Sequence, residues 1–486
     1  MNIKVKITKC IWLLSAALVA ACGGGGSSSS TPSVEKAQVS GVVSDIAQTG
    51  LANVTVQVAG SATQSSSDSR GRFSLLLETG KSHTLKLSKA GFASQFKVVN
   101  FPAGSQSAFF DARMITQEAA QAVASVENGF AVTGKDGARV TMPANAVVNA
   151  AGQPVTGDIQ VSITPVNISG ADISAFPGLF AGIAQAGVRV GLVSFGTAEY
   201  LMTQNGQPLH VAPGKTAEIE IPQYATKNLD GSNVALGQKI PMWFLDETTG
   251  VWQQEGEGEV VASTGTSGLA LRGSVSHFSW HNVDIALLNP AFARLRCVGV
   301  AGQFTVDSSC TVAGAFVAPG GAGFVAGGEI PANGASDSVA IFPDQGIRLR
   351  GCALVVTSSQ ERGVACGATT VNIAAGTSQS VDIPLKLENP WAGNITGNLT
   401  GPVTANLKII GTSITGTARA FNVDWQVNGT INPDDTITFG FADGGTATVD
   451  FSGTVNALRG QMTGTWRAVT GPSAGRVGAF NLAITE

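Results

Sequence analysis

The sequence predicts an all-β, multidomain protein in which β-sandwiches are followed by a small C-terminal up-and-down β-barrel. Charged residues make up only 13% of the chain, while Gly alone contributes 61 residues. A mixture rich in Gly, Ser, Thr, Ala and Val disfavours long surface helices and favours short strands joined by turns. Apolar and polar residues alternate in short runs along most of the chain. Because 486 residues exceed one ordinary core, we expect several domains.

The N-terminus predicts export from a bacterial cell. Lys4, Lys6 and Lys9 form a positive region, and the apolar stretch over residues 11–21 has the length of a signal peptide. Residues 1–21 are therefore expected to be a leader. Its removal would change the formal net charge of −4 to −7, by −4 minus 3. No run of basic residues occurs, so nucleic acid is not an expected partner.

The end of this leader predicts a lipid anchor. Val19-Ala20-Ala21-Cys22 resembles the lipobox of bacterial lipoproteins, in which Cys22 is diacylated and becomes the new N-terminus. The alternative is an ordinary secretory signal in which Cys22 is incidental. A Gly/Ser-rich tether follows within residues 22–35, as a domain attached to a lipid requires. Gly23 after the cysteine favours the outer membrane, by resemblance to enterobacterial sorting. We expect a cell-envelope protein held on the membrane by its N-terminal lipid.

The first domain is expected over residues 36–114, where period-2 runs recur about every ten residues. The order of these runs resembles the carboxypeptidase regulatory-like domain, a transthyretin-type sandwich. The segments that carry the resemblance are Gly41-Val42-Val43-Ser44-Asp45, Gly50-Leu51-Ala52-Asn53-Val54, Ser67-Asp68-Ser69-Arg70-Gly71-Arg72-Phe73 and Lys89-Ala90-Gly91-Phe92. The resemblance implies a modular, non-catalytic role.

A second β-sandwich is expected over residues 115–284. Its strand-like runs include Pro241-Met242-Trp243-Phe244-Leu245-Asp246 and end with Val275-Ser276-His277-Phe278-Ser279-Trp280. The pattern resembles the β-sandwich shared by zonula occludens proteins and netrin receptors, which also occurs as the function-to-find domain of inflammasome sensors.

Two further domains are predicted. Residues 285–388 contain Cys297, Cys310, Cys352 and Cys366, and an even cluster in an oxidising envelope indicates two disulfides. We expect pairs Cys297–Cys310 and Cys352–Cys366, with Cys297–Cys352 as the alternative. In residues 389–486, glycines punctuate alternating strands, as in a meander that closes into a barrel. This pattern of glycines and short strands resembles avidin- or lipocalin-type barrels, in which side chains or a ligand fill the interior.

One triplet has plausible chemistry. His277-Phe278-Ser279 resembles the site at which self-cleaving domains of inflammasome sensors break their own chain, with Ser279 as nucleophile and His277 as base. Self-cleavage also requires a strained peptide bond. A histidine, an aromatic residue and a small hydroxyl at the end of the domain's final strand need no such explanation, so we expect the chain to stay uncut.

No metal or cofactor site is expected. The chain has four histidines, with no H-E-x-x-H spacing. On one strand face, His277 and His281 would be separated by roughly 13 Å between their Cα atoms, too far to share a metal. Gly471-Pro472-Ser473-Ala474-Gly475 matches a nucleophile motif, but no histidine follows it, so it is predicted to be a barrel turn.

The sequence therefore predicts a non-enzymatic binding, adhesion or scaffold module of the envelope, with an unidentified protein or glycan partner. The alternatives are a protein that cleaves itself between Phe278 and Ser279, and a carrier that holds a small ligand in the C-terminal barrel.

Overall fold

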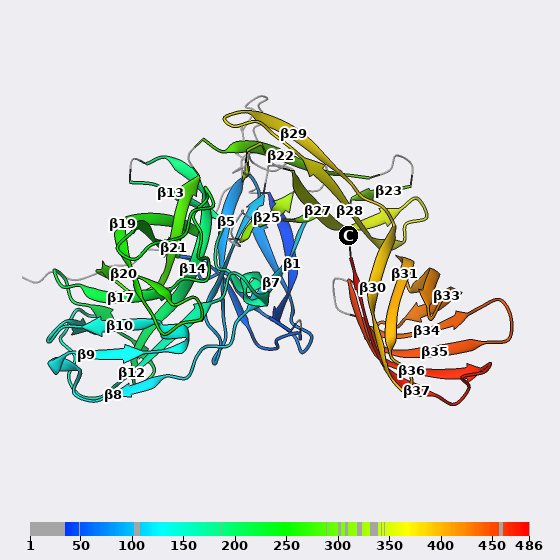
Figure 1. Cartoon of the computed structure of the whole chain (residues 1–486), viewed down its shortest axis with the longest axis horizontal. Helices are drawn as coiled ribbons and strands as arrows, with labels where there is room; N and C mark the ends of the chain where they lie inside the picture. The colour runs from blue at the N-terminus through cyan, green and yellow to red at the C-terminus, as the bar shows by residue number, and fades with distance from the viewer. Residues whose placement is uncertain are drawn as a thin grey trace, which may run out of the picture. The chain divides into compact units, whose positions relative to one another are not determined.

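The computed structural model describes residues 35–485, apart from 48, 102–106, 186, 288, 300–302, 307–309, 318–322, 331–338, 342, 345 and 456–459. Strands dominate these residues, and the helical segments among them are three 3-10 turns: Val126–Asn128, Lys135–Gly137 and Ala171–Ala175 (Figure 1). The all-β prediction is confirmed. In the described part of the chain, no helix has the length and apolar character needed to cross a membrane.

The N-terminal region is a sandwich of two sheets. One sheet has the order β4-β1-β7 and the other β3-β2-β5-β6. Their strands are β1 (Lys36–Asp45), β2 (Thr55–Val58), β3 (Gln64–Ser66), β4 (Arg72–Glu78), β5 (Lys81–Ser88), β6 (Gln95–Phe101) and β7 (Ser107–Met114). Alternate residues are buried in β4 and in the first half of β1, and these strands share a core that includes Val39, Leu75 and Leu87.

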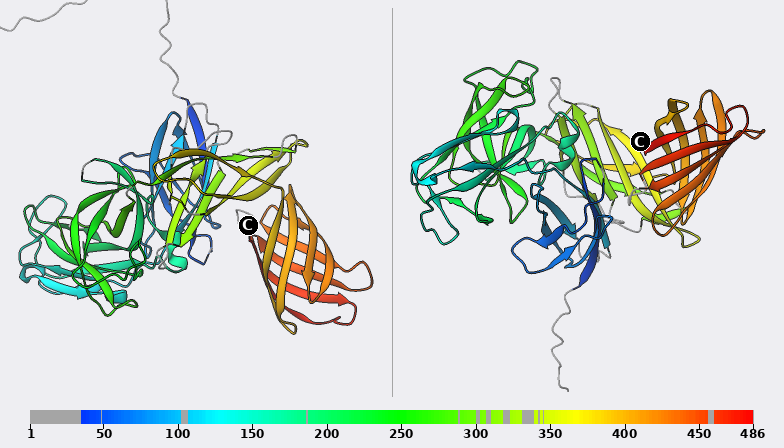
Figure 2. Two further views of the ribbon diagram at one scale, coloured as in Figure 1. Left: turned by 45° about the horizontal axis from the view of Figure 1, so that its top comes forward. Right: turned by 90° about the horizontal axis from the view of Figure 1, so that it is seen from below.

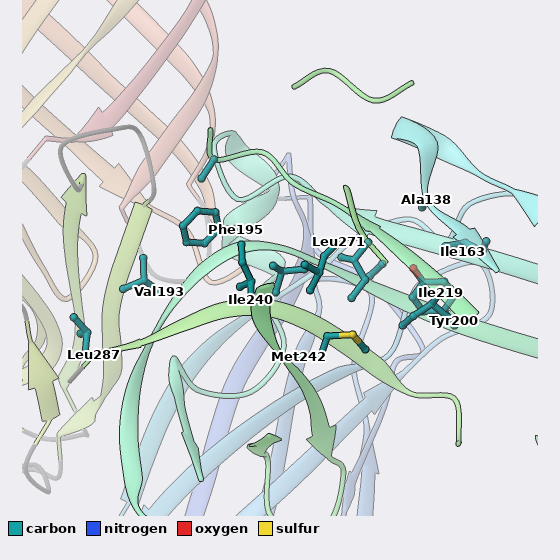
Figure 3. Packing of buried hydrophobic residues seen from close by; sticks show 14 of the residues in the cluster. Ala138, Ile163, Val193, Phe195, Tyr200, Ile219, Ile240, Met242, Leu271 and Leu287 are labelled. Atoms are coloured by element: carbon teal, nitrogen blue, oxygen red, sulfur yellow. The ribbon is translucent and has the colours of Figure 1, made fainter. Parts of the chain in front are cut away.

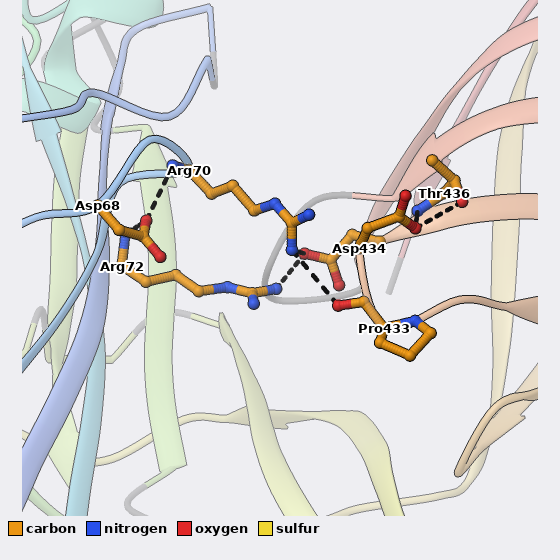
Figure 4. Close-up of polar contacts among 7 residues, drawn as sticks. Asp68, Arg70, Arg72, Pro433, Asp434 and Thr436 are labelled. Carbon is orange, nitrogen blue, oxygen red and sulfur yellow. Dashed lines mark hydrogen bonds and ion pairs between the residues drawn. The ribbon is translucent and has the colours of Figure 1, made fainter.

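Asp68 closes the turn that leads into β4. Its Oδ1 accepts the backbone N–H of Arg70 at 2.8 Å and of Arg72 at 2.9 Å (Figure 4). A side-chain carboxylate that satisfies two turn amides explains why an aspartate precedes Gly71, which has φ +79°. Thus this segment of the sequence forms a tight turn before the strand.

The second region is built on a twelve-stranded sheet whose main path is β8-β12-β14-β21-β18-β19-β20-β17-β10-β9. The path comprises β8 (Gln121–Val123), β9 (Phe130–Thr133), β10 (Arg139–Met142), β12 (Ile159–Val166), β14 (Arg189–Gln204), β17 (Ala217–Pro222), β18 (Lys239–Asp246), β19 (Val251–Ala262), β20 (Leu269–Val275) and β21 (Trp280–Leu287). Strand β13 (Ala181–Ile183) pairs with β14 and β19, and β15 (Gln207–Pro208) pairs with β14. A short pair, β11 (Val147–Val148) with β16 (His210–Val211), lies outside this sheet.

Strand β14 is buried along most of its length on both faces. One face contributes Phe195 and Tyr200 to a core with Met242 and Leu271 (Figure 3). The other face packs against Trp243 and Trp280, among others. A strand covered on both sides must bury its polar residues as well, and this places several of them out of reach of water.

The third region consists of a three-stranded sheet with the order β26-β22-β29 and of the first strands of a thirteen-stranded sheet, in the order β25-β24-β27-β28, which β23 joins through β27. The strands are β22 (Ala291–Val298), β23 (Phe304–Val306), β24 (Cys310–Val317), β25 (Gly323–Ile330), β26 (Val339–Ile341), β27 (Ile347–Thr357), β28 (Arg362–Val371) and β29 (Ser378–Pro384). The predicted disulfides Cys297–Cys310 and Cys352–Cys366 are both present, and the alternative pairing is not formed. The first joins the two sheets through β22 and β24, and the second joins register partners on β27 and β28.

The C-terminal region is a closed barrel of eight antiparallel strands. They follow one another as neighbours, and the last pairs with the first. The strands are β30 (Glu388–Gly397), β31 (Gly401–Ile410), β32 (Ser413–Ala420), β33 (Val423–Ile431), β34 (Thr436–Ala442), β35 (Thr448–Val455), β36 (Gln461–Thr470) and β37 (Val477–Ile484). In β31, buried and exposed residues alternate strictly. Two views of the ribbon show the barrel strands in orange and red (Figure 2). The predicted up-and-down barrel is confirmed.

Candidate functional site

The sequence-predicted anchor, Cys22, lies outside the described residues. Of the described cysteines, Cys297, Cys310 and Cys366 are buried. As disulfide partners they have no free thiolate, so they stabilise the third region and supply no nucleophile or metal ligand.

The triplet His277-Phe278-Ser279 lies in the bend between β20 and β21, and not at the end of the final strand. The expectation that the triplet ends the final strand was therefore wrong. The final strand begins at Trp280, because Trp280 and Asn282 are buried residues that pair with β14, and Asn282 also pairs with β18. The bend turns the chain back far enough for the ring of His281 to contact the backbone carbonyl of His277 at 3.2 Å through Nε2.

This bend brings the two histidines together. Their ring centroids are 5.4 Å apart, whereas an extended strand would have kept them well separated. Between them lies Glu255, with Oε1 2.7 Å from Nδ1 of His281 and Oε2 4.0 Å from Nδ1 of His277. The side chain of His281 is fully buried. Burial lowers the pKa of His277, as does neighbouring His281, while the charge of Glu255 opposes the shift.

A β-bulge positions Glu255. In the pairing of β18 with β19, Met242 faces Gly256 and Trp243 faces Gln254, so Glu255 is the extra residue of β19. A bulge redirects a side chain that regular alternation would have placed elsewhere. Sequence reasoning missed Glu255, because a bulge is set by the packing of neighbouring strands and leaves little trace in an alternating pattern.

The triplet does not form a nucleophile–base pair. Ser279 Oγ donates to the carbonyl of Trp280 at 3.0 Å, and the His277 ring packs edge-on against Phe244, with centroids 4.6 Å apart. None of residues 277–279 has a positive φ. Self-cleavage requires the hydroxyl to be activated by a base and the peptide bond to be strained, and this geometry offers neither. Within the described residues, no three His, Cys, Asp or Glu side chains are placed to hold a metal ion.

A second candidate site is a groove of about 900 Å³ on the barrel. It crosses five consecutive strands, from β33 to β37. The residues that line it are Asn428, Gly429, Thr430, Thr438, Phe439, Gly440, Asp450, Phe451, Ser452, Thr465, Trp466, Arg467, Val477 and Gly478. The polar members of this set are exposed, whereas Phe439, Phe451 and Trp466 are buried. The groove is therefore on the outer face of the barrel.

Glycines bend the strands at this groove. A Cβ atom at Gly478 would lie 1.7 Å from the carbonyl oxygen of Thr396, and one at Gly429 would lie 2.2 Å from Cβ of Phe439. Only glycine permits so close an approach, and such positions mark sharp bends of barrel strands. We attribute the hollow on the outer face to these bends.

The groove presents hydrogen-bonding groups in rows. Thr430 and Thr438 face each other across β33 and β34, with their Oγ1 atoms 3.2 Å apart. Asp450 and Arg467 are register partners on β35 and β36. Together, the hydroxyls, one amide, one carboxylate and one guanidinium group supply both donors and acceptors of hydrogen bonds. Because the two charges balance, the surface suits an uncharged polar ligand.

The barrel interior is packed with aromatic side chains. Phe439 and Phe451 stack with centroids 4.7 Å apart, and Phe480 packs edge-on against Phe451 at 5.2 Å. These residues belong to one buried cluster that includes Trp466 and Leu482. Interior space taken by rings and aliphatic chains favours ligand contact at the outer face. The predicted turn at Gly471–Gly475 is confirmed, since it connects β36 to β37.

The alternation within each strand predicts which residues point outward. It does not predict that the outward residues of five strands form one groove. The available signal was the repetition of Thr, Ser and Asn at those positions in successive strands.

Comparison with protein families identifies a domain at the beginning of the chain. No curated protein matches the chain significantly. The family model of the CarboxypepD_reg-like domain matches residues 39–123, which run from within β1 to the end of β8. The N-terminal sandwich of this chain is therefore a carboxypeptidase regulatory-like domain, as its sequence motifs predicted.

Proposed function

We propose that this protein is a non-enzymatic binding module of the bacterial cell envelope, held on the outer membrane by lipid at Cys22. We further propose that the groove on the outer face of its C-terminal barrel binds a glycan. The groove is the single observation that carries this proposal, since it gathers exposed hydrogen-bonding side chains from five strands. In the polar cluster around His281, by contrast, both ring nitrogens of His281 already have partners within the protein.

The chemistry of the groove supports a glycan. Its side chains are mainly hydroxyls and an amide, with Asp450 and Arg467 as the charged members. Such groups exchange hydrogen bonds with sugar hydroxyls, which donate and accept in the same way. Neighbouring strands lie about 4.8 Å apart, so five strands span roughly 19 Å, enough for several sugar units. The exposed Val477 adds an apolar contact at the edge.

Binding of the full chain to an array of immobilised bacterial glycans tests this proposal. We expect a bound neutral glycan, and a loss of at least tenfold in affinity, or about 1.4 kcal/mol, in a Thr438→Arg variant that fills the groove. The matched control is Thr415→Arg, an exposed residue of β32 outside the groove. Equal losses in both variants, or binding only to an envelope protein, would contradict the proposal.

The anchor is tested separately by fatty-acid labelling. The wild type should carry label and remain with membranes, whereas Cys22→Ala should lose the label and become soluble. Cys10→Ala, which changes the other leader-region cysteine, should retain the label. Membrane retention of unlabelled Cys22→Ala would show that something other than lipid holds the protein.

A further inference from the structure

A hydroxyl, a carboxamide and a carboxyl group form a continuous chain inside the second region. Ser194 on β14 and Asn282 and Asp284 on β21 all have a fully buried residue surface. Ser194 Oγ donates to Asn282 Oδ1 at 2.8 Å, and Asn282 Nδ2 donates to Asp284 Oδ2 at 2.6 Å. Neither the proposed envelope function nor the barrel groove uses these three residues.

An irregularity of β14 creates this arrangement. Ser194 pairs with Asp284 and Gly196 with Val283, so the register shifts between Ser194 and Gly196. The backbone N–H of Gly196 also donates to Ser194 Oγ at 3.3 Å. As in other bulges, the extra residue re-aims a neighbouring side chain. Here the serine hydroxyl is directed at the asparagine side chain of the adjacent strand.

The carboxyl group of Asp284 is buried away from water. Burial raises the pKa of its carboxyl well above the usual range, and the neighbouring Ser194 hydroxyl opposes this shift only in part. Burial therefore favours the neutral, protonated form of this carboxyl. Its Oδ2 accepts from Asn282, and its Oδ1 has no hydrogen-bond partner, so one polar atom of this buried acid is unpaired. A buried neutral acid of this kind can donate a proton to a reacting group.

We propose that Ser194 and Asn282 form an intramolecular ester cross-link between β14 and β21. Ser194 Oγ attacks Asn282 Cγ, so the Oγ–Cγ bond forms and the Cγ–Nδ2 bond breaks. Asp284 gives its proton to the departing Nδ2 and receives the proton of the serine hydroxyl, and one ammonia molecule leaves. Atoms and charges balance, and Asp284 ends as it began. Holding the two groups in contact supplies the effective concentration that such a step requires.

The surroundings protect the product. Trp243 is fully buried beside Asp284 and donates from Nε1 to its backbone carbonyl at 3.0 Å. Exclusion of water prevents hydrolysis of an ester that would otherwise be labile. The cross-link would join residues 88 positions apart in sequence and fix two central strands of the sheet.

Mass spectrometry of the full, wild-type chain tests this proposal without any variant. We expect a proteolytic product in which the Ser194 and Asn282 peptides are joined, with a mass lower by one ammonia than their sum. Alkaline hydroxylamine should separate them. Two unlinked peptides of full mass would overturn the proposal.

Variants then assign the roles. Ser194→Ala and Asp284→Asn should both give the full, linear mass, whereas Thr197→Ala should keep the ammonia loss. Thr197 is a fitting control because it is equally buried on β14, and its hydroxyl donates to the carbonyl of His281. Continued ammonia loss in Ser194→Ala would exclude the ester, even if the wild type shows a lighter mass.

Discussion

The sheet around β14 and the C-terminal barrel treat polar side chains in opposite ways. β14 is covered on both faces and buries Ser194, Thr197 and Glu199. The barrel strands alternate, so their polar residues are exposed and their apolar residues fill the interior. Polar groups of the sheet around β14 contact one another in the protein interior, whereas those of the barrel are exposed at the surface. The same strand geometry therefore buries polar side chains in one region and exposes them in the other.

The largest expected effect comes from substitutions of residues on opposite faces of one barrel strand. Phe451 is buried among Phe439, Phe441 and Phe480, while its neighbour Ser452 is exposed in the groove. Phe451→Ala should lower the free energy of unfolding of the barrel by about 3–5 kcal/mol. Ser452→Ala should change it by less than about 0.5 kcal/mol and weaken glycan binding instead. Urea unfolding and binding measurements on both variants distinguish these results, and similar destabilisation by both would break the comparison.

The buried acid Glu199 provides the corresponding test of the β14 sheet. Burial raises its pKa to about 7, against the opposing hydrogen bonds from Ser94. The folded state thus holds this proton more tightly than the unfolded state. Its contribution to stability is complete below about pH 4.5 and is lost as pH rises through about 7, by roughly 3 kcal/mol.

Urea unfolding between pH 4.5 and 8 should therefore show stability falling with pH, and Glu199→Gln should remove about that much of the fall. The raised pKa of Asp284 acts with the same sign and remains in the variant. The exposed Glu259→Gln is the control and should leave the slope unchanged. A wild-type curve that rises across this range would show that Glu199 is hydrated.

Loss of either disulfide is expected to lower the free energy of unfolding by about as much as the pH effect at Glu199, or slightly less. Cys297 and Cys310 are 13 positions apart, and Cys352 and Cys366 are 14 apart. In the chain-entropy model each closes a loop worth about 3 kcal/mol. Replacing either pair by alanine should lower stability by that order in urea unfolding, and non-reduced peptide mapping should recover both pairs. Free thiols at these positions in the purified protein would contradict the assignment.

Local patterns predicted most of the fold, because alternation and turn residues determine strands within the barrel and the N-terminal sandwich. These patterns did not predict the side chains that a bulge or a register shift between strands orients. Glu255 reaches His281 through a bulge, and Ser194 reaches Asn282 through a register shift. Such features depend on which strands become neighbours, and β14 and β21 are far apart in sequence. The cysteine pairs were predictable because their loops are short.

The smallest expected effect concerns the bend at His277-Phe278-Ser279. We predict one intact band on a denaturing gel of the purified protein, and the same band in His277→Ala and Ser279→Ala. The hydroxyl of Ser279 is directed to the carbonyl of Trp280, and His277 packs against Phe244, so the base does not contact the nucleophile. Phe278 stacks near Tyr200 at a centroid distance of 6.2 Å, which anchors the bend as a packed corner. Two bands, with the smaller fragment beginning at Ser279 and absent in Ser279→Ala, would show that the loop rearranges into a reactive geometry. In that case the half-buried bend, and not the buried face of β14, would be the reactive part of the sheet.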